Sequence, residues 1–506
     1  MPFTSLLFIL VALPVVIIID RILKPTIANI FLAVFSLFFY AWADLKSIPL
    51  FLAVIAINYL VALLTSKLIP NHKKMASFAT FIGVAANIGV LVYFKYLKWI
   101  YAEFSGRLGI TLPFSGHVNN IVAAVAVSFF TFHAVSFLLD VNWGIVKAPK
   151  NPLTVLIYIA LFPKMIQGPI MRYDDFHKNM INRSVSLDDI QAGASRFIIG
   201  LSKKLIIATP FGVHADRIYA IANNTDSMIT GGAPVAMAWL GTFFYCMQLF
   251  FDFSGYSDMA IGIGQMLGIK IPQNFNYPYI SKRVAEFWRR WHMSLGEWFK
   301  VYLYTPLFRI FLKQSNNGKK IPIFWIDVFA LLVLWVMVGF WHGAGLKYLV
   351  CGLAWFSLIA GERFFDMYEK KRRKKLKLPQ KKAEKLHQKI LGHIYLIVAV
   401  LLIQVIFRAN TLADAGNYLK CMFGLNGAGF TSQYTKMMFG DMAILSLIAI
   451  ALSTPLLAFL YEMVKKIKPL HGIITVTQPF ILAGMLLIDI SITSTVVVNP
   501  FLYQQF

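Results

Sequence analysis

Acidic residues are scarce in this sequence, and charge of any kind is low. Of its 506 residues only 14% are Asp, Glu, Lys or Arg, and 23 acidic side chains stand against 48 basic ones. With 58% hydrophobic residues, the chain is far more apolar than a soluble globular protein. We therefore predict a polytopic membrane protein.

Cysteine is also rare. The three cysteines, Cys246, Cys351 and Cys421, lie in or beside apolar segments and show no C-x-x-C spacing. Such a pattern indicates neither a disulfide framework nor a zinc site. We expect all three to be packing residues and predict no metal.

The formal charge of +25 would suggest nucleic-acid binding in a soluble protein. Here the basic residues cluster in short loops between apolar runs, which is the pattern that sets membrane orientation. We therefore predict no nucleic-acid partner.

Apolar runs long enough to cross a bilayer, which takes about 20 residues, recur along the chain. They predict an all-α polytopic protein with about 11 spanning helices, together with re-entrant and interfacial helices. The expected spans are 1–20, 28–43, 48–65, 77–97, 119–140, 232–251, 321–341, 346–361, 391–408, 440–462 and 473–489.

Basic residues beside these runs predict which ends face the cytoplasm. Arg21 and Lys24 place the first loop inside, and Lys147 and Lys150 lie in a later loop that also falls inside. The stretch 370–389 is the densest cationic segment of the chain. We expect it to be a solvated cytoplasmic loop that attracts anionic lipid.

Two stretches depart from the spanning pattern. Residues 152–169 end in FPKMIQGP, where two prolines and a glycine break the helix. Because broken backbone at membrane depth must be buried in protein or line a wet cavity, we predict a re-entrant segment. Lys164 and Arg172 beside the break either bind donor phosphates or anchor the turn at the interface.

Residues 187–213 alternate polar and apolar groups at helical spacing, which predicts an interfacial helix.

The stretch 251–345 contains FDFSGYSDMAIGIGQMLG, FWRRWHMSLGEW and GFWHGAG. The last two motifs carry His292 and His342, and His342 follows the apolar run 321–341. An ionisable ring at such a place is a functional-site hypothesis by default. The alternative for His342 is a core histidine satisfied by a backbone carbonyl, and for His292 an interfacial helix with an aromatic belt.

Asp252 and Asp258 are the acidic members of this stretch. Their separation of six residues fits neither a helical pair nor a known ligand loop. We interpret Asp252 as a hydrogen-bonded structural group, and Asp258 as stabilising a helix N-terminus near Ser257.

These segments resemble the membrane-bound O-acyltransferase family, and within it the bacterial branch typified by alginate O-acetyltransferases. The resemblance extends to SFFTFHAVSFLLDV (128–141), FPKMIQGPIMRY (162–173), NFNYPYIS (274–281) and NPFLYQQF (499–506), and so covers most of the chain. It implies tilted helices around a central tunnel, in which a cytoplasmic acyl thioester meets an acceptor from the other side.

Acyl transfer to a hydroxyl needs a base and donors for the developing oxyanion. We predict His342 as the base and His292 as a group that orients or stabilises. Asp252, Arg289 and Tyr277 are candidates for the surrounding shell.

The resemblance implies a multi-pass enzyme of the bacterial inner membrane with no bound cofactor. We expect it to move an acetyl group from a thioester such as acetyl-CoA, held near Lys164 and Arg172. The acceptor is an extracytoplasmic polysaccharide or a partner protein that completes the transfer, and membrane lipid is a further partner. We expect one integral-membrane domain, with N-terminal helices at 1–118, an acyltransferase core at 119–410 and C-terminal helices at 411–506.

Two alternatives remain open. Transfer of D-alanine to teichoic acid is similar in architecture; YSDMA and QGPIMRY favour the alginate-type branch, although LFRIFLKQSNNGKK stands where that branch carries a glycine-rich loop. The other alternative is a transporter or flippase that uses the histidines as a proton relay. Transporters commonly show paired broken helices in two repeated halves, and we find one break, at 162–169.

Overall fold

The computed structural model describes residues 2–109, 115–181, 183–226, 229, 231–377, 385–495 and 501. Every regular element in these residues is a helix, which confirms the all-α prediction. The chain forms two compact units, one of Met1–Ser202, Gly255–Gln273 and Met485–Phe506, the other of Lys203–Ser254 and Asn274–Gly484. The borders predicted near residues 118 and 410 stay a prediction.

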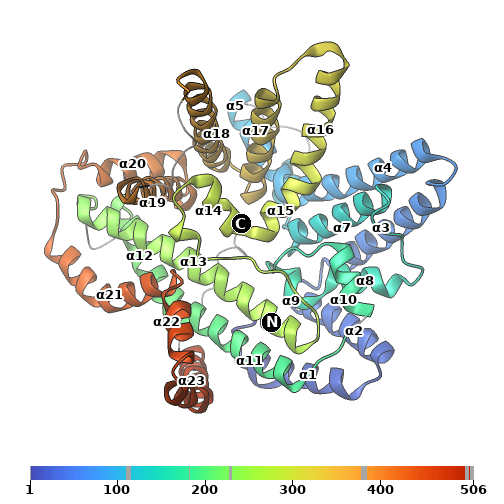
Figure 1. Ribbon diagram of the computed structural model, residues 1–506, viewed down its shortest axis with the longest axis horizontal. Coiled ribbons are helices and arrows are strands. Elements are labelled where there is room, and N and C mark those ends of the chain that lie inside the picture. The colour runs from blue at the N-terminus through green and yellow to red at the C-terminus, as the bar shows by residue number, and fades with distance from the viewer. Residues whose placement is uncertain are drawn as a thin grey trace. The chain divides into compact units, whose positions relative to one another are not determined.

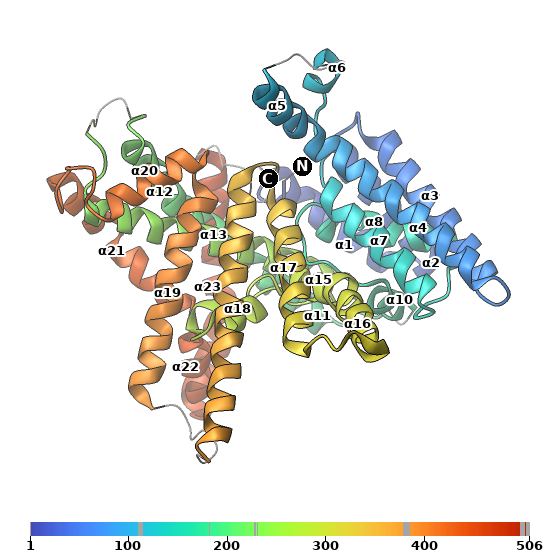
Figure 2. The same ribbon diagram turned by 90° about the horizontal axis from the view of Figure 1, so that it is seen from above.

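The first unit is built on helices that pack side by side (Figures 1 and 2). They are α2 (Pro25–Ala43), α3 (Ile48–Leu68), α4 (Lys73–Leu91), α7 (Val127–Asn142) and α8 (Pro152–Ala160). Pro25 and Pro152 occupy the first helical turn, where a missing N–H costs no hydrogen bond. Helix α7 packs against α3, α4 and α8, and nearly all of its residues are buried.

The remaining helices of the first unit are η1 (Phe8–Ala12), α1 (Leu13–Ile22), η2 (Val92–Tyr96), α5 (Leu97–Leu108), α6 (Ser115–Asn119), α9 (Phe162–Met165), α10 (Tyr173–Ile181) and α11 (Leu187–Ser202). Two long helices, α13 (Val235–Met266) and α23 (Lys468–Thr495), contribute residues to both units.

In the second unit, α17 (Ile323–His342) and α18 (Leu346–Lys375) run side by side in both views, and α19 (Leu386–Arg408) packs on α18. A Cβ on Gly339 would lie 2.6 Å from the Tyr348 carbonyl oxygen, so the close approach of α17 and α18 requires glycine there. The other helices of this unit are η3 (Lys203–Ala208), α12 (Thr209–Ala222), η4 (Pro278–Ile280), α14 (Val284–Arg290), α15 (Met293–Phe299), η5 (Lys300–Tyr304), α16 (Thr305–Gln314), η6 (Ser315–Lys319), α20 (Leu412–Met422), α21 (Gln433–Leu452) and α22 (Leu456–Lys465).

Ten helices among the described residues are long and apolar enough to cross a membrane, which confirms a multi-pass membrane protein. All but one coincide with a predicted span. The exception is the continuous helical stretch Leu187–Ala222, where we predicted a shorter interfacial helix. Its polar groups find partners inside the protein: the Ser202 hydroxyl, for example, donates to the Asp489 carboxylate at 2.6 Å. This internal pairing explains the alternating pattern without a membrane interface.

Two predicted spans are absent from those ten helices. The run 1–20 corresponds to η1 and α1, which together end at Ile22 and fall short of the length of a span. The run 119–140 is helical only from Val127 onward, because the chain before it leaves the helix and Ala126 adopts a left-handed φ of 60°. Sequence hydropathy does not register such a backbone turn.

The predicted break in the segment 152–169 is confirmed. Helix α8 ends at Ala160, and Leu161 leaves the helical conformation with a ψ of 113° before α9 begins. The freed N–H of Phe162 donates to the Ser36 hydroxyl at 3.2 Å. The break is buried in protein, one of the two settings in which broken backbone is tolerated at membrane depth.

The basic stretch 370–389 is more helical than predicted. Helix α18 continues to Lys375 and α19 begins at Leu386, while residues 378–384 lie outside the described part of the chain. At 1.5 Å per residue, the 30 residues of α18 extend about 45 Å, more than the ~30 Å of a hydrocarbon core. Its charged end therefore extends beyond the apolar layer.

The orientation can be tested with Lys374→Cys in a background that lacks Cys246, Cys351 and Cys421. Because Lys374 lies in the exposed basic end of α18, we expect the new thiol to resist an impermeant reagent in intact cells and to react after lysis. Asn410→Cys, just beyond the other end of α19, is the matched control and should react in intact cells. The opposite labelling pattern would reverse the orientation and the sides assigned to donor and acceptor.

Candidate active site

His292 lies between α14 and α15 in a strained backbone conformation. Its φ of 46° and ψ of 52° fall in the left-handed region, which side chains other than glycine rarely adopt. The residue is only 1% exposed. Such strain persists where the surroundings fix the chain. Here the N–H of Met293 donates to the carbonyl of Asn274 at 2.9 Å, which fixes the backbone next to the ring.

The side chain of Asn274 determines which nitrogen of His292 carries the proton. Its Oδ1 atom lies 3.2 Å from Nδ1 of His292, and it accepts hydrogen bonds from the N–H and hydroxyl of Ser294 at 3.2 and 2.9 Å. Because a backbone N–H can only donate, this atom of Asn274 must be the amide oxygen. Nδ1 of His292 is therefore the donor, and Nε2 is the nitrogen that can accept a proton.

Aromatic rings enclose His292 and connect it to the second histidine. The ring centroid of Phe253 lies 4.6 Å from that of His292, and Trp341 lies 5.9 Å away. Trp341 also contacts His342, at 4.7 Å. The structure thus gathers the histidines of two separate motifs around one indole.

The environment keeps His292 neutral. Burial lowers the pKa of His292 well below its usual value, because an imidazolium loses hydration there, and the nearby His342 lowers the pKa further. A neutral imidazole at pH 7 can act as a proton acceptor.

His342 is the last residue of α17. It is buried, and its ring packs edge-on against Phe407 on α19, with centroids 5.1 Å apart. The chain leaves the helix directly after it at Gly343, where a larger residue would clash with the ring of Tyr348. Helix end, turn and aromatic packing together hold this histidine in place.

Asp252 is half of a buried ion pair. Its carboxylate accepts a hydrogen bond from the ammonium group of Lys204, and both side chains are almost completely buried. This confirms that Asp252 is hydrogen-bonded, and its purely structural role stays a prediction. Its neighbour Phe253 is the residue that contacts His292. A role for Asp252 in the shell of the site stays a prediction.

Our interpretation of Asp258 is wrong. The residue lies inside α13 rather than near a helix N-terminus, and its carboxylate pairs with Arg196 at 2.9 Å. The error arose because the polar S-G-Y-S-D letters imitate a helix start, whereas the helix runs through them.

The other predicted shell residues lie farther toward the surface. Arg289 is exposed on α14, and Tyr277 is half-buried just before η4, with a left-handed φ of 45°. On the same helix as Arg289, Glu286 and Arg290 form an ion pair at 3.1 Å. The contributions of Arg289 and Tyr277 stay predictions.

The two predicted donor-binding residues belong to the first unit. Lys164 is fully buried: its ammonium group donates to the carbonyl of Tyr158 and lies 4.7 Å from the centroid of that residue's ring. An interfacial anchor would be exposed, so that interpretation is wrong for Lys164. Arg172 is half-buried. Donor binding by either residue stays a prediction.

Sequence reasoning missed Asn274 and Lys204. Asn274 precedes His292 by 18 residues, and no helical or strand period connects them. Its position in NFNYPYIS was the available signal, since that segment belongs to the resemblance. Lys204 lies within the segment 187–213, and its acidic partner Asp252 is 48 residues away in the sequence.

The chain is similar to known proteins over most of its length. The model of MBOAT, the membrane-bound O-acyltransferase family, matches residues 146–379. The chain is 34% identical over 361 residues to a probable alginate O-acetylase of Pseudomonas syringae pv. tomato, an alignment that covers 71% of this chain and 65% of that protein.

Two further relatives differ in the activity for which they are named. A peptidoglycan O-acetyltransferase of Helicobacter pylori is 31% identical over 433 residues, covering 80% of this chain and 75% of that protein. A teichoic acid D-alanyltransferase of Bacillus subtilis is 31% identical over 256 residues, covering 50% and 62%. The chain therefore belongs to the membrane-bound O-acyltransferase family and is a multi-pass membrane acyltransferase.

Proposed function

We propose that this protein transfers an acetyl group from a cytoplasmic thioester, such as acetyl-CoA, toward an extracytoplasmic polysaccharide. The observation that carries the proposal is the buried pair of histidines around Trp341, one of them held by Asn274 as a neutral proton acceptor. Relatives named for alginate and peptidoglycan support a polysaccharide acceptor, reached directly or through a partner protein. The bacterial inner membrane is the proposed location.

In the proposed reaction, His342 removes the proton of an acceptor hydroxyl while its oxygen attacks the thioester carbonyl. A carbon–oxygen bond forms and the carbon–sulfur bond breaks, and the proton then passes from His342 to the departing thiolate. We propose that His292 orients the reacting groups rather than stabilising the oxyanion. With the proton of neutral His292 on Nδ1 and directed at Asn274, Nε2 can only accept a hydrogen bond, so His292 cannot donate to an oxyanion through that atom.

D-alanyl transfer to teichoic acid is the second candidate, favoured by the relative named for it. The same histidine arrangement serves either acyl group, because both reactions bring a hydroxyl to an activated carbonyl. Mass spectrometry of the cell-envelope polymers, with and without the protein, distinguishes an added acetyl group from an added D-alanyl group. The transporter alternative receives no support from the family.

The decisive variant is His342→Gln, which keeps most of the side-chain volume. Removal of a positioned base should lower acyl transfer by about 10²- to 10⁴-fold, measured as label incorporated into the polymer, while expression and thermal unfolding stay close to the parent. His292→Gln should also lower transfer but leave residual activity.

His393→Gln is the matched control, because His393 on α19 is a half-buried histidine. Its Nδ1 lies 3.0 Å from the carbonyl oxygen of Ser281. It should leave transfer unchanged. Parental activity in His342→Gln would mean that the base lies elsewhere.

A second prediction concerns Asn274 and the pH profile. Asn274→Asp keeps an oxygen beside Nδ1, but its negative charge favours the imidazolium and should raise the pKa of His292. Because transfer needs neutral His292, the acidic limb of the kcat/KM profile should move to higher pH. Asn274→Leu should lower transfer at every pH.

Asn58→Leu is the control for this pair, since Asn58 is a buried amide that pairs with Asn87 at 2.8 and 3.0 Å in the first unit. It should reduce thermal stability without moving the acidic limb. An unshifted limb in Asn274→Asp would remove Asn274 as the residue that positions His292.

A further inference from the structure

Helix α23 carries polar side chains along one face of its first half. His471, Thr475 and Gln478 stand four and three residues apart, a spacing that places them on the same side of a helix. Thr475 and Gln478 are exposed, His471 is half-buried, and all three belong to the second unit. Because α23 is one of the helices able to cross the membrane, this polar face requires an explanation.

Gln478 lies near the middle of the bilayer. It follows Lys468, the first residue of α23, by ten residues, which is about 15 Å of helix at 1.5 Å per residue. Lys465, Lys466 and Lys468 mark the head-group level at this end, and a hydrocarbon core is ~30 Å thick. The amide therefore lies about half-way across the layer that holds no water.

The amide of Gln478 faces outward without a partner. The residue is exposed, and no residue that the structure describes forms a hydrogen bond with its side chain. Lipid tails neither donate nor accept hydrogen bonds, so an amide that meets them is left unsatisfied. Glutamine side chains of spanning helices form hydrogen bonds with neighbouring helices instead. Gln478 therefore indicates contact with a further helix.

Pro479 leaves a second group unsatisfied at the same depth. The proline lies inside α23 and has no N–H, so the carbonyl of Thr475, four residues earlier, loses its helical donor. In spanning helices, neighbouring helices are among the groups that satisfy such a carbonyl. The hydroxyl of Thr475 donates to the carbonyl of His471 at 2.9 Å and so does not compensate for the loss. The face thus offers a free acceptor beside the amide.

Two other polar groups of spanning helices find their partners inside the protein. Asn58 on α3 and Asn87 on α4 form a reciprocal amide pair, with distances of 2.8 and 3.0 Å. On α23 itself, the buried Asp489 accepts a hydrogen bond from Ser202 at 2.6 Å. The pair of Asn58 and Asn87 shows how two facing amides satisfy each other, because each donates to the other.

A second copy of this chain carries the matching amide at the matching depth. All copies are inserted in the same direction, so a two-fold axis between two of them runs along the membrane normal, and identical residues meet across it. A primary amide is complementary to itself, because it both donates and accepts. Thr475 is small, which lets the two helices approach closely. The polar face of α23 is therefore suited to its own copy.

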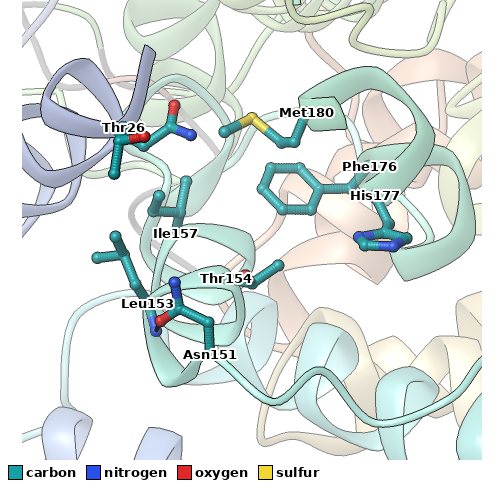
Figure 3. Close-up of a pocket in the computed structure, with 9 residues that line it drawn as sticks. Thr26, Asn151, Leu153, Thr154, Ile157, Phe176, His177 and Met180 are labelled. Atoms are coloured by element: carbon teal, nitrogen blue, oxygen red, sulfur yellow. Dashed lines mark hydrogen bonds between the residues drawn. The ribbon is translucent and has the colours of Figure 1, made fainter. Parts of the chain in front are cut away.

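The cavity in Figure 3 lies elsewhere in the chain. It has a volume of about 250 Å³ and belongs to the first unit, where Thr26 of α2, Ile157 of α8 and Phe176 of α10 surround it. No residue of α23 lines it. The polar face is thus an open helix surface rather than a wall of this cavity, and a helix fits it better than a small ligand.

We propose that two copies of this protein associate in the membrane through α23. The amide of Gln478 in one protomer forms two hydrogen bonds with the same amide of its partner, and His471 and Thr475 extend the contact along the helix. The proposal rests on the contacts of α23 and does not depend on the acyl-transfer reaction.

The test is to count photobleaching steps of the labelled, full-length protein in lipid vesicles over a series of protein-to-lipid ratios. We expect an equilibrium between monomer and dimer. Gln478→Leu removes the amide and keeps most of the volume, and leucine is favourable in a spanning helix. It should weaken dimerisation by about threefold to thirtyfold, the range for a polar contact between spanning helices. Gln478→Asn, which keeps an amide, should dimerise more strongly than Gln478→Leu.

Phe480→Leu is the matched control. Phe480 is 74% exposed and lies two residues from Gln478, at similar depth but on the opposite face of the helix. This variant should dimerise like the parent. Monomers at every ratio, or parental dimerisation in Gln478→Leu, would overturn the proposal.

Cysteine cross-linking locates the contact. In the background that lacks the three native cysteines, Thr475→Cys should give a disulfide-linked dimer on oxidation, whereas Phe480→Cys should not. Cross-linking through Phe480→Cys alone would place the contact on the other face and contradict the proposal. A different membrane protein that purifies with the parent and is lost in Gln478→Leu would also overturn it, because the face would then bind another helix.

Discussion

The hydrogen bond between Asn274 and His292 is the constraint on which the candidate site depends. One amide oxygen accepts hydrogen bonds from the imidazole, the hydroxyl of Ser294 and the backbone N–H of Ser294. The backbone carbonyl of the same asparagine holds Met293. A single residue therefore fixes the strained turn, the start of the next helix and the position of the proton on the ring. The chemistry and the local fold share the same contacts.

Three acidic residues of this apolar chain are paired with basic residues inside the protein. Asp252 forms a buried pair with Lys204, and Asp20 forms one with Arg183 at 2.7 Å, whereas the pair of Asp258 and Arg196 is half-buried. Loss of one partner from a buried pair typically destabilises a protein by about 3–5 kcal/mol, because the other charge remains without compensation. Asp252 and Asp20 therefore contribute to the stability of the fold. These pairs connect segments distant in sequence, and each pair lies within one unit.

Much of the fold follows from hydropathy, because a run of about 20 apolar residues has few alternatives to a spanning helix. Hydropathy could not predict the features that depend on contacts between residues distant in sequence. Residues 187–213 were predicted to be interfacial because a sequence pattern cannot show that Ser202 faces Asp489. The run before Val127 looked helical because a left-handed Ala126 has no sequence signature. The histidines were visible as titratable rings in apolar surroundings, whereas Asn274 becomes meaningful only when the chain brings it against His292.

The break at Leu161 has a consequence for how the protein is made. With nine residues, α8 is far too short for the insertion machinery to recognise as a membrane segment. Its burial depends on packing against α2, α3 and α7, which must already be in the bilayer. Assembly therefore has two stages, first the insertion of the long helices and then the docking of a short segment among them. A chain whose long helices are correctly inserted can therefore still lack the docked α8.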